Sequence, residues 1–122
     1  MSFVASRIVA VVIDCRDAAS LAAFWCAALG YQVVRRWRDA RGREYVEAAA
    51  DGRPTLLFHP VSQDKTGKNR LHLDLRPTDG NQDAEVRRLV ELGARVVSSE
   101  QDLPWVVLAD PEGNEFCVLP PA

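Results

Sequence analysis

Hydrophobic and polar positions along the first half of the chain follow the periods of a strand and then of a helix. Residues 8–13 form a run of β-branched and small apolar side chains, which is typical of a strand with at least one buried face. The next apolar residues recur at the spacing of one face of a helix. They are Leu21, Phe24, Trp25, Ala28 and Leu29. Asp17 is placed to cap this helix and Gly30 to end it.

Three strand-like runs separated by turn residues complete this half. Strands are predicted over residues 31–38, 44–49 and 55–59, and turns at 39–42 and 51–52. The first half therefore predicts the order strand, helix, and three further strands.

The second half repeats the same order at a period of about 62 residues. Residues 71–75 alternate apolar and polar side chains, as a strand with two different faces does. Asp79 and Gln82 fit the start of a helix that Gly93 ends. Its apolar positions are Val86, Leu89, Val90 and Leu92. The last three strands are predicted over residues 95–99, 105–109 and 115–119.

Two βαβββ modules follow from this repeat, so the predicted fold is α+β. Each module should place its helix on one face of its strands and leave the other face open. Strand twist should then make a curved, mixed eight-stranded sheet around a cleft, which is a usual place for a small ligand. We expect one domain over residues 1–122, with module one at about 1–60, a polar linker at about 61–69 and module two at about 70–122.

Charge and cysteine content narrow the classes of partner. The chain has 122 residues and a net charge of −2, from 15 Lys and Arg against 17 Asp and Glu, so nothing favours nucleic acid or a membrane surface as a partner. Its three cysteines show no CxxC spacing, which argues against a disulfide framework or a structural zinc site. The first residues lack the pattern of a signal peptide, and we expect a cytoplasmic protein.

Several motifs resemble those of the vicinal oxygen chelate superfamily, which includes glyoxalase-like and bleomycin-resistance proteins. The matching segments are Leu21-Ala22-Ala23-Phe24-Trp25, Ala28-Leu29-Gly30-Tyr31, residues 68–75, Leu92-Gly93-Ala94 and residues 110–116. The resemblance covers nearly the whole chain and implies the same fold. It also implies a small-molecule ligand and a homodimer.

The resemblance implies four metal-ligand positions, on the first and last strands of each module. The repeat places them at Ala10, Leu56, His72 and Cys117. Methyl and isobutyl groups cannot coordinate a metal, and a catalytic ion generally needs three protein ligands. We therefore expect no metal and no other cofactor. A divalent metal is the less favoured alternative and would need ligands from elsewhere, such as His59 or Glu115.

Polar and aromatic side chains supply the candidate ligand contacts. Arg70, His72 and Asp74 alternate with leucines, which should pack under the helix and turn the polar groups toward the cleft. An ion pair between Arg70 and Asp74 that only holds the strand in place is an equal alternative. Trp37 and Trp105 suit the walls of a site for a planar ligand, although strand aromatics also serve as core.

The predicted function is small-molecule binding of the type that sequesters drugs or metabolites. The predicted ligand-binding residues are Ala10, Trp37, Leu56, Arg70, His72, Asp74, Trp105 and Cys117. The competing hypothesis is a glyoxalase-like lyase or isomerase that uses His72 as general base, with Asp74 or Arg70 assisting.

Overall fold

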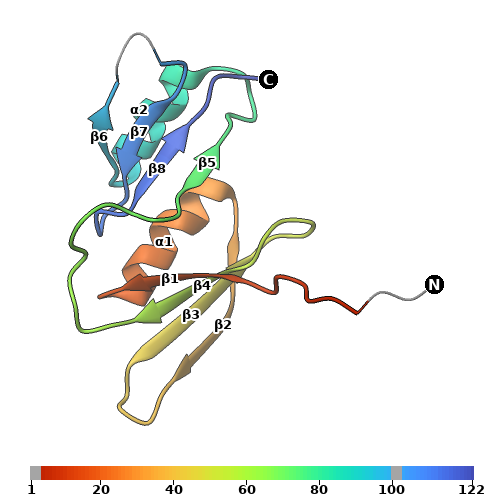
Figure 1. The fold of residues 1–122 in the computed structure, drawn as a ribbon, viewed down its shortest axis with the longest axis vertical. Coiled ribbons are helices and arrows are strands. Elements are labelled where there is room, and N and C mark those ends of the chain that lie inside the picture. Colours follow the sequence, from red (N-terminus) through yellow and green to blue (C-terminus); the bar gives the residue numbers. More distant parts are fainter. Residues whose placement is uncertain (1–3, 100–102) are drawn as a thin grey trace. The chain divides into compact units, whose positions relative to one another are not determined.

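The chain divides into two compact units, Met1–Val61 and Ser62–Ala122, which we call module one and module two (Figure 1). The computed structural model describes residues 4–99 and 103–122. Each module has the predicted βαβββ order, and each carries a four-stranded sheet with one helix. The α+β prediction is therefore confirmed.

Module one contains one helix and four strands. In chain order they are β1 (Val11–Cys15), α1 (Ala18–Leu29), β2 (Gln32–Arg38), β3 (Glu44–Ala49) and β4 (Leu56–Pro60). The sheet order is β1-β4-β3-β2, and β1 runs parallel to β4 while the other pairs are antiparallel. The first strand begins at Val11, three residues later than predicted, because its partner strand begins at Leu56, directly opposite.

Helix α1 begins and ends as its sequence predicts. The Asp17 carboxylate accepts a hydrogen bond from the Ser20 amide at 3.1 Å, which satisfies one of the free N–H groups of the first turn. Gly30 adopts the left-handed conformation, with φ of 70°, and donates its N–H to the Cys26 carbonyl. A residue with a side chain would be strained at that φ.

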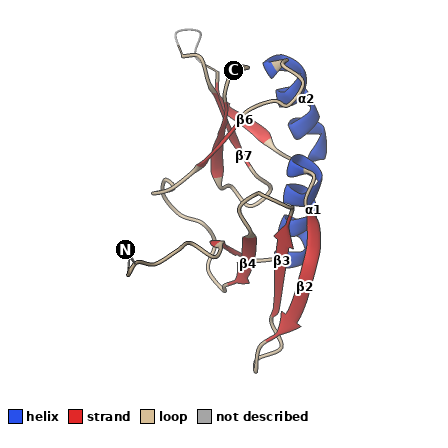
Figure 2. Cartoon of the chain, turned by 90° about the vertical axis from the view of Figure 1, so that its right-hand side faces the viewer, coloured by secondary structure: helices blue, strands red, loops and turns tan. Residues whose placement is uncertain are grey.

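Burial alternates along the strands of module one. Val46, Ala48, Leu56 and Phe58 are between 0% and 2% exposed, whereas Leu57 and His59 are partly exposed. The buried set faces α1, which lies along one face of the sheet (Figure 2). We call the opposite side of each sheet its open face. Trp25, 2% exposed, and Leu21, 0% exposed, fill the core from the helix.

Module two repeats this architecture with shorter strands. Its elements are β5 (Leu73–Leu75), α2 (Gln82–Leu92), β6 (Arg95–Ser98), β7 (Val106–Ala109) and β8 (Glu115–Val118). The sheet order β5-β8-β7-β6 matches that of module one, again with the first and last strands parallel. Asp110, 2% exposed, organises the β7–β8 turn by accepting hydrogen bonds from the Glu112 and Asn114 amides at 2.9 and 3.0 Å.

Helix α2 departs from the prediction at its start and along its apolar side. Asn81, rather than Asp79, caps it, with the side chain accepting a hydrogen bond from the Ala84 amide at 2.9 Å. In α2, all of which the structure describes, Leu89 alone is buried, while Val90 and Leu92 are 41% and 38% exposed. Of the four apolar residues predicted to face the core from this helix, only Leu89 is therefore buried.

Two further expectations need correction. Within the described residues, the ladder hydrogen bonds run inside each group of four strands, so the expected eight-stranded sheet consists of two four-stranded sheets. Leu71 was expected to pack under a helix, yet it is 86% exposed and precedes β5, which begins at Leu73. No helix in the described part of the chain is long and apolar enough to span a membrane.

Candidate functional site

The parallel pair of β5 and β8 brings three chemically different side chains together in module two. Asp74 and Cys117 are register partners on these strands, and His72 lies two residues before Asp74 and therefore on the same face. The His72 Nε2 atom is 3.1 Å from the Asp74 carboxylate, and each of these side chains is about half exposed. The imidazole, carboxylate and thiol groups lie within 4.8 Å of one another.

The Cys117 thiol is the buried member of this cluster. Cys117 is 8% exposed, and burial raises the pKa of its thiol, with the nearby Asp74 carboxylate acting in the same direction. In the absence of a cation the sulfur is therefore protonated at neutral pH, which makes it a poor nucleophile. The structure describes Cys15, Cys26 and Cys117, and none of them forms a disulfide bond.

A hollow of about 330 Å³ opens over this cluster, on the open face of module two. Apolar groups form part of its wall and charged groups the rest, a combination found in small-molecule sites. The lining residues are Lys68, His72, Asp74, Trp105, Val107, Glu115, Phe116, Cys117 and Leu119.

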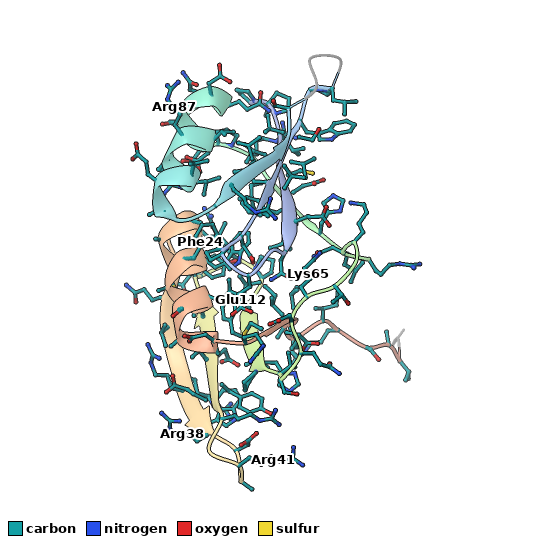
Figure 3. The ribbon with its side chains drawn as sticks, turned by 90° about the vertical axis from the view of Figure 1, so that its left-hand side faces the viewer. Phe24, Arg38, Arg41, Lys65, Arg87 and Glu112 are labelled. Carbon is teal, nitrogen blue, oxygen red and sulfur yellow. The ribbon has the colours of Figure 1, made fainter. Side chains whose placement is uncertain are left out.

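Glu115 is tied to the loop that precedes β5. Its carboxylate accepts a hydrogen bond from the Asn69 amide at 3.1 Å and lies 3.8 Å from the Lys65 ammonium and 3.6 Å from that of Lys68. Lys65 lies on this loop in Figure 3. The Asn69 hydrogen bond, followed by the two lysines, lowers the pKa of Glu115. The hollow therefore has an ionised carboxylate at its rim that is already paired with cations.

The structure brings four of the predicted site residues together and places the others elsewhere. His72, Asp74, Trp105 and Cys117 line the hollow. Arg70 is exposed on the preceding loop and does not line it. Ala10, Trp37 and Leu56 belong to module one.

Leu56 does not occupy the position that the repeat assigned to it. It is 2% exposed and faces the helix side of its sheet. Register places Leu57 opposite Val12 in module one, as Cys117 lies opposite Asp74 in module two. The counterpart of Cys117 is therefore Leu57. Counting from the turn glycine missed this because the chain needs one more residue to reach the open face after Gly52 than after Gly113.

The open face of module one carries a row of stacked side chains. Trp37 and Tyr45 stack with ring centroids 5.2 Å apart, and the Tyr45 and His59 rings are 5.1 Å apart. The Arg35 guanidinium lies 4.2 Å from the Trp37 ring centroid, on the face of the ring. His59 Nδ1 is 3.0 Å from the Asp14 carboxylate, so the far end of the row is also paired. Trp37 therefore packs within this row.

Five residues that line the hollow were not predicted as ligand contacts: Lys68, Val107, Glu115, Phe116 and Leu119. Glu115 was considered only as a metal ligand, although it lies two residues from Cys117 on β8 and so shares its face. Val107 is the register partner of Cys117, and the same alternation could have indicated both residues. Lys68 comes from the loop, where no periodic pattern fixes the position of a side chain.

Comparison with known proteins assigns the family. A model of the glyoxalase-like domain matches residues 10–119, so the chain belongs to the glyoxalase-like domain family, within the vicinal oxygen chelate superfamily. The predicted resemblance is confirmed. Comparison with curated proteins finds no significant match.

Solved structures share the fold at low sequence identity. A glyoxalase/bleomycin resistance protein/dioxygenase family enzyme from Burkholderia phytofirmans is 21% identical with a TM-score of 0.73, over 93% of this chain and 97% of that one. The fosfomycin resistance protein FosX from Listeria monocytogenes is 10% identical with a TM-score of 0.77, over 98% and 96%. TnmS3, an antibiotic binding protein from a Streptomyces species, is 20% identical with a TM-score of 0.64, over 99% and 100%.

The four metal-ligand positions implied by the superfamily do not fit a metal in this chain. The repeat gives Ala10, His72 and Cys117, and strand register replaces Leu56 by Leu57 as the fourth position. Two of the four side chains have no donor atom, and the remaining imidazole and thiol are too few for a catalytic ion. This set of side chains therefore cannot hold the metal that the superfamily implies.

Proposed function

We propose that the protein binds a small organic ligand in the hollow of module two, as a drug- or metabolite-sequestering member of its family, without the superfamily's four-ligand metal. The hollow itself carries this proposal. A volume of about 330 Å³ is at the small end of the range for ligand sites, which is about 300–1,000 Å³. Its wall combines an indole and aliphatic groups with a few charged side chains.

The side chains around the hollow define the ligand chemistry. Trp105 is 38% exposed and offers a ring against which a planar or alicyclic group can pack. His72 and Asp74 offer a hydrogen-bond donor and an acceptor at one end of the hollow. The expected ligand is a mainly apolar molecule with one polar edge. TnmS3, a relative of similar fold, is described as an antibiotic binding protein, which supports a binding role.

Ala10 and Trp37 stay predicted contacts from module one, and Arg70 stays a predicted contact from the loop. We do not extend the proposal to Leu56, because it is 2% exposed on the helix side of its sheet. A dimer and a cytoplasmic location also stay predictions.

The first test is a ligand screen by thermal shift in the presence of a chelator, followed by calorimetric titration of the hits. Replacing Trp105 by Ala should weaken binding about tenfold or more, since burying an aromatic group contributes roughly 1.5–3 kcal/mol, and Trp105→Phe should recover part of this loss. Arg87→Ala is the matched surface control, because Arg87 projects from the exposed side of α2 (Figure 3). Equal affinities for the wild type and Trp105→Ala would overturn the assignment to this hollow.

A lyase or isomerase is the second candidate, and one observation favours it. The contact of 3.1 Å between His72 Nε2 and the Asp74 carboxylate would orient an imidazole that acts as general base. An enzyme should lose turnover in His72→Ala while it keeps substrate affinity. A sequestering protein should show no turnover of the bound ligand in either form, as followed by mass spectrometry of that ligand.

A further inference from the structure

The cluster of His72, Asp74 and Cys117 has a feature that organic-ligand binding does not require. It offers one nitrogen, one oxygen and one sulfur donor, all within 4.8 Å of one another. The backbone fixes their arrangement, since Asp74 and Cys117 face each other across a parallel strand pair. His72 is two residues from Asp74 in the chain, and the two side chains are 3.1 Å apart.

The separation of 3.1 Å between His72 and Asp74 is close to that of two ligands in a coordination shell, and no two of the three donor atoms are more than 4.8 Å apart. Ligands held about 2.0–2.3 Å from a tetrahedral ion lie roughly 3.3–3.8 Å from one another. The contact between His72 and Asp74 is slightly shorter than this. Both side chains are about half exposed, so the surrounding packing leaves them room to rotate toward an ion.

The donor set also selects the class of ion. Magnesium and calcium take oxygen ligands, whereas a thiolate with an imidazole and a carboxylate suits zinc and similar borderline-soft ions. On binding, the thiol loses its proton, and the thiolate together with Asp74 then balances a double positive charge. Glu115, the other carboxylate of the hollow, is already paired with Lys65 and Lys68.

We propose that His72, Asp74 and Cys117 form a binding site for a thiophilic divalent cation of the zinc class, held by module two alone, with its fourth position open to the hollow. This site differs from the set that the superfamily implies. Asp74 has no place in that set, and no ligand comes from module one. Module one has Ala10, Val12 and Leu57 at the three corresponding positions, so it provides no second copy of the site.

Cobalt is the probe for this site. We expect metal-stripped full-length protein to bind one Co²⁺ per chain, with a thiolate-to-cobalt charge-transfer absorption and the visible bands of a tetrahedral ion. Zn²⁺ should abolish these signals at lower concentration, in line with its higher affinity for such donors. Absence of a thiolate-to-cobalt band would overturn the proposal, as would a band that is present in Cys117→Ser.

Three variants identify the ligands. Cys117→Ser should remove the charge-transfer band, and Asp74→Asn and His72→Gln should each weaken Co²⁺ binding at least tenfold. Cys26→Ser is the matched control and should leave the band unchanged, because Cys26 lies on α1 in module one. An unchanged affinity in Asp74→Asn would overturn the three-residue site.

Thiol labelling keeps the proposal testable if Cys117→Ser does not fold. In the wild type, Zn²⁺ should slow modification of Cys117 by a thiol reagent at least tenfold and leave that of Cys26 unchanged. Equal rates with and without Zn²⁺ would overturn the proposal. These measurements use no organic ligand, and the ligand screen above is carried out with chelator present. Each proposal can therefore fail while the other stands.

Discussion

The two modules share one fold but use the same positions on their open faces in opposite ways. In module two Asp74 lies opposite Cys117, and His72 directly precedes the strand that carries Asp74. Module one has Val12, Leu57 and Ala10 at the corresponding positions. At the other end of the face, module one has the paired Asp14 and His59. The positions of Tyr45 and Trp105 also correspond by register. Tyr45 stacks between Trp37 and His59, whereas Trp105 lines the hollow.

This difference shows that the residues that maintain the fold are separate from the residues that form a site. The buried faces of both sheets keep apolar side chains, such as Phe58 and Phe116, at 0% and 1% exposure. The open faces are free to differ, since their side chains do not have to fill a core. One face closes by stacking its own side chains, and the other keeps a hollow with three unlike donors.

The helices differ as well, and their cores give the largest expected effect. Helix α1 buries Ala18, Leu21, Ala22, Phe24, Trp25 and Ala28, so module one should depend strongly on it. Trp25→Ala should lower the free energy of unfolding by about 3–5 kcal/mol, as measured by chemical denaturation. Val90→Ala in α2, at a position 41% exposed, should cost less than about 1 kcal/mol. A loss in Val90→Ala as large as that in Trp25→Ala would contradict the exposed position of Val90.

Helix α2 depends on a single fully buried side chain. Leu89 is 0% exposed, and its replacement by Ala should cost about 2–4 kcal/mol. Because its neighbours in α2 add little burial, the loss should appear as faster amide hydrogen exchange concentrated in residues 82–92. Exchange that rises evenly over both modules would contradict this separate anchoring.

The two helix caps provide a matched pair of smaller effects. Asp17 and Asn81 each accept a hydrogen bond from an amide of the first turn, at 3.1 and 2.9 Å. Asp17→Ala and Asn81→Ala should each cost about 1 kcal/mol. Loss of the cap should lower the thermal stability of the affected module, whereas Asp79→Ala should have little effect on stability. A larger loss in Asp79→Ala than in Asn81→Ala would restore the cap that the sequence predicted.

Acidification should remove the smallest of these contributions. The hydrogen bond from the Ser20 amide, followed by that from its side chain, lowers the pKa of Asp17 below its ordinary value of 3.8. The ionised carboxylate therefore stabilises the folded state above that value, and the contribution is lost as the pH falls below it. Near neutral pH, the free energy of unfolding of the wild type should exceed that of Asp17→Asn by about 0.3–1 kcal/mol. This difference should disappear below about pH 4. A gap that stays constant down to about pH 3 would exclude this origin.

Much of the fold was predictable because local signals agree with tertiary packing. Asp17, Gly30 and the apolar stripe between them fixed α1, and β3 has the predicted limits of 44 and 49. The start of β1 was less predictable, because this edge strand begins opposite Leu56, the first residue of its partner β4. The start of β5 was less predictable as well. Leu71 has the alternation of a strand residue, yet β5 begins only at Leu73.

The candidate site was predictable in part, and for a similar reason. Alternation placed His72 and Asp74 on one face, and the repeat indicated Cys117 as their neighbour. The counterpart in module one was assigned to Leu56 instead of Leu57, since the length of a turn is not encoded in strand periodicity. Lys68 and the exposed position of Arg70 depend on the path of a loop, which no periodic pattern describes.

The parallel pairing of first and last strands has a kinetic consequence. Asp14 meets His59, 45 residues later in the chain, so each sheet closes through its most distant contact. Such non-local pairings form slowly. The sheet of each module is fully hydrogen-bonded only when its last strand has paired. Module one closes at Pro60, before any residue of β5 is needed. During synthesis on the ribosome, module one should therefore reach its native sheet while the cluster of His72, Asp74 and Cys117 has yet to be made.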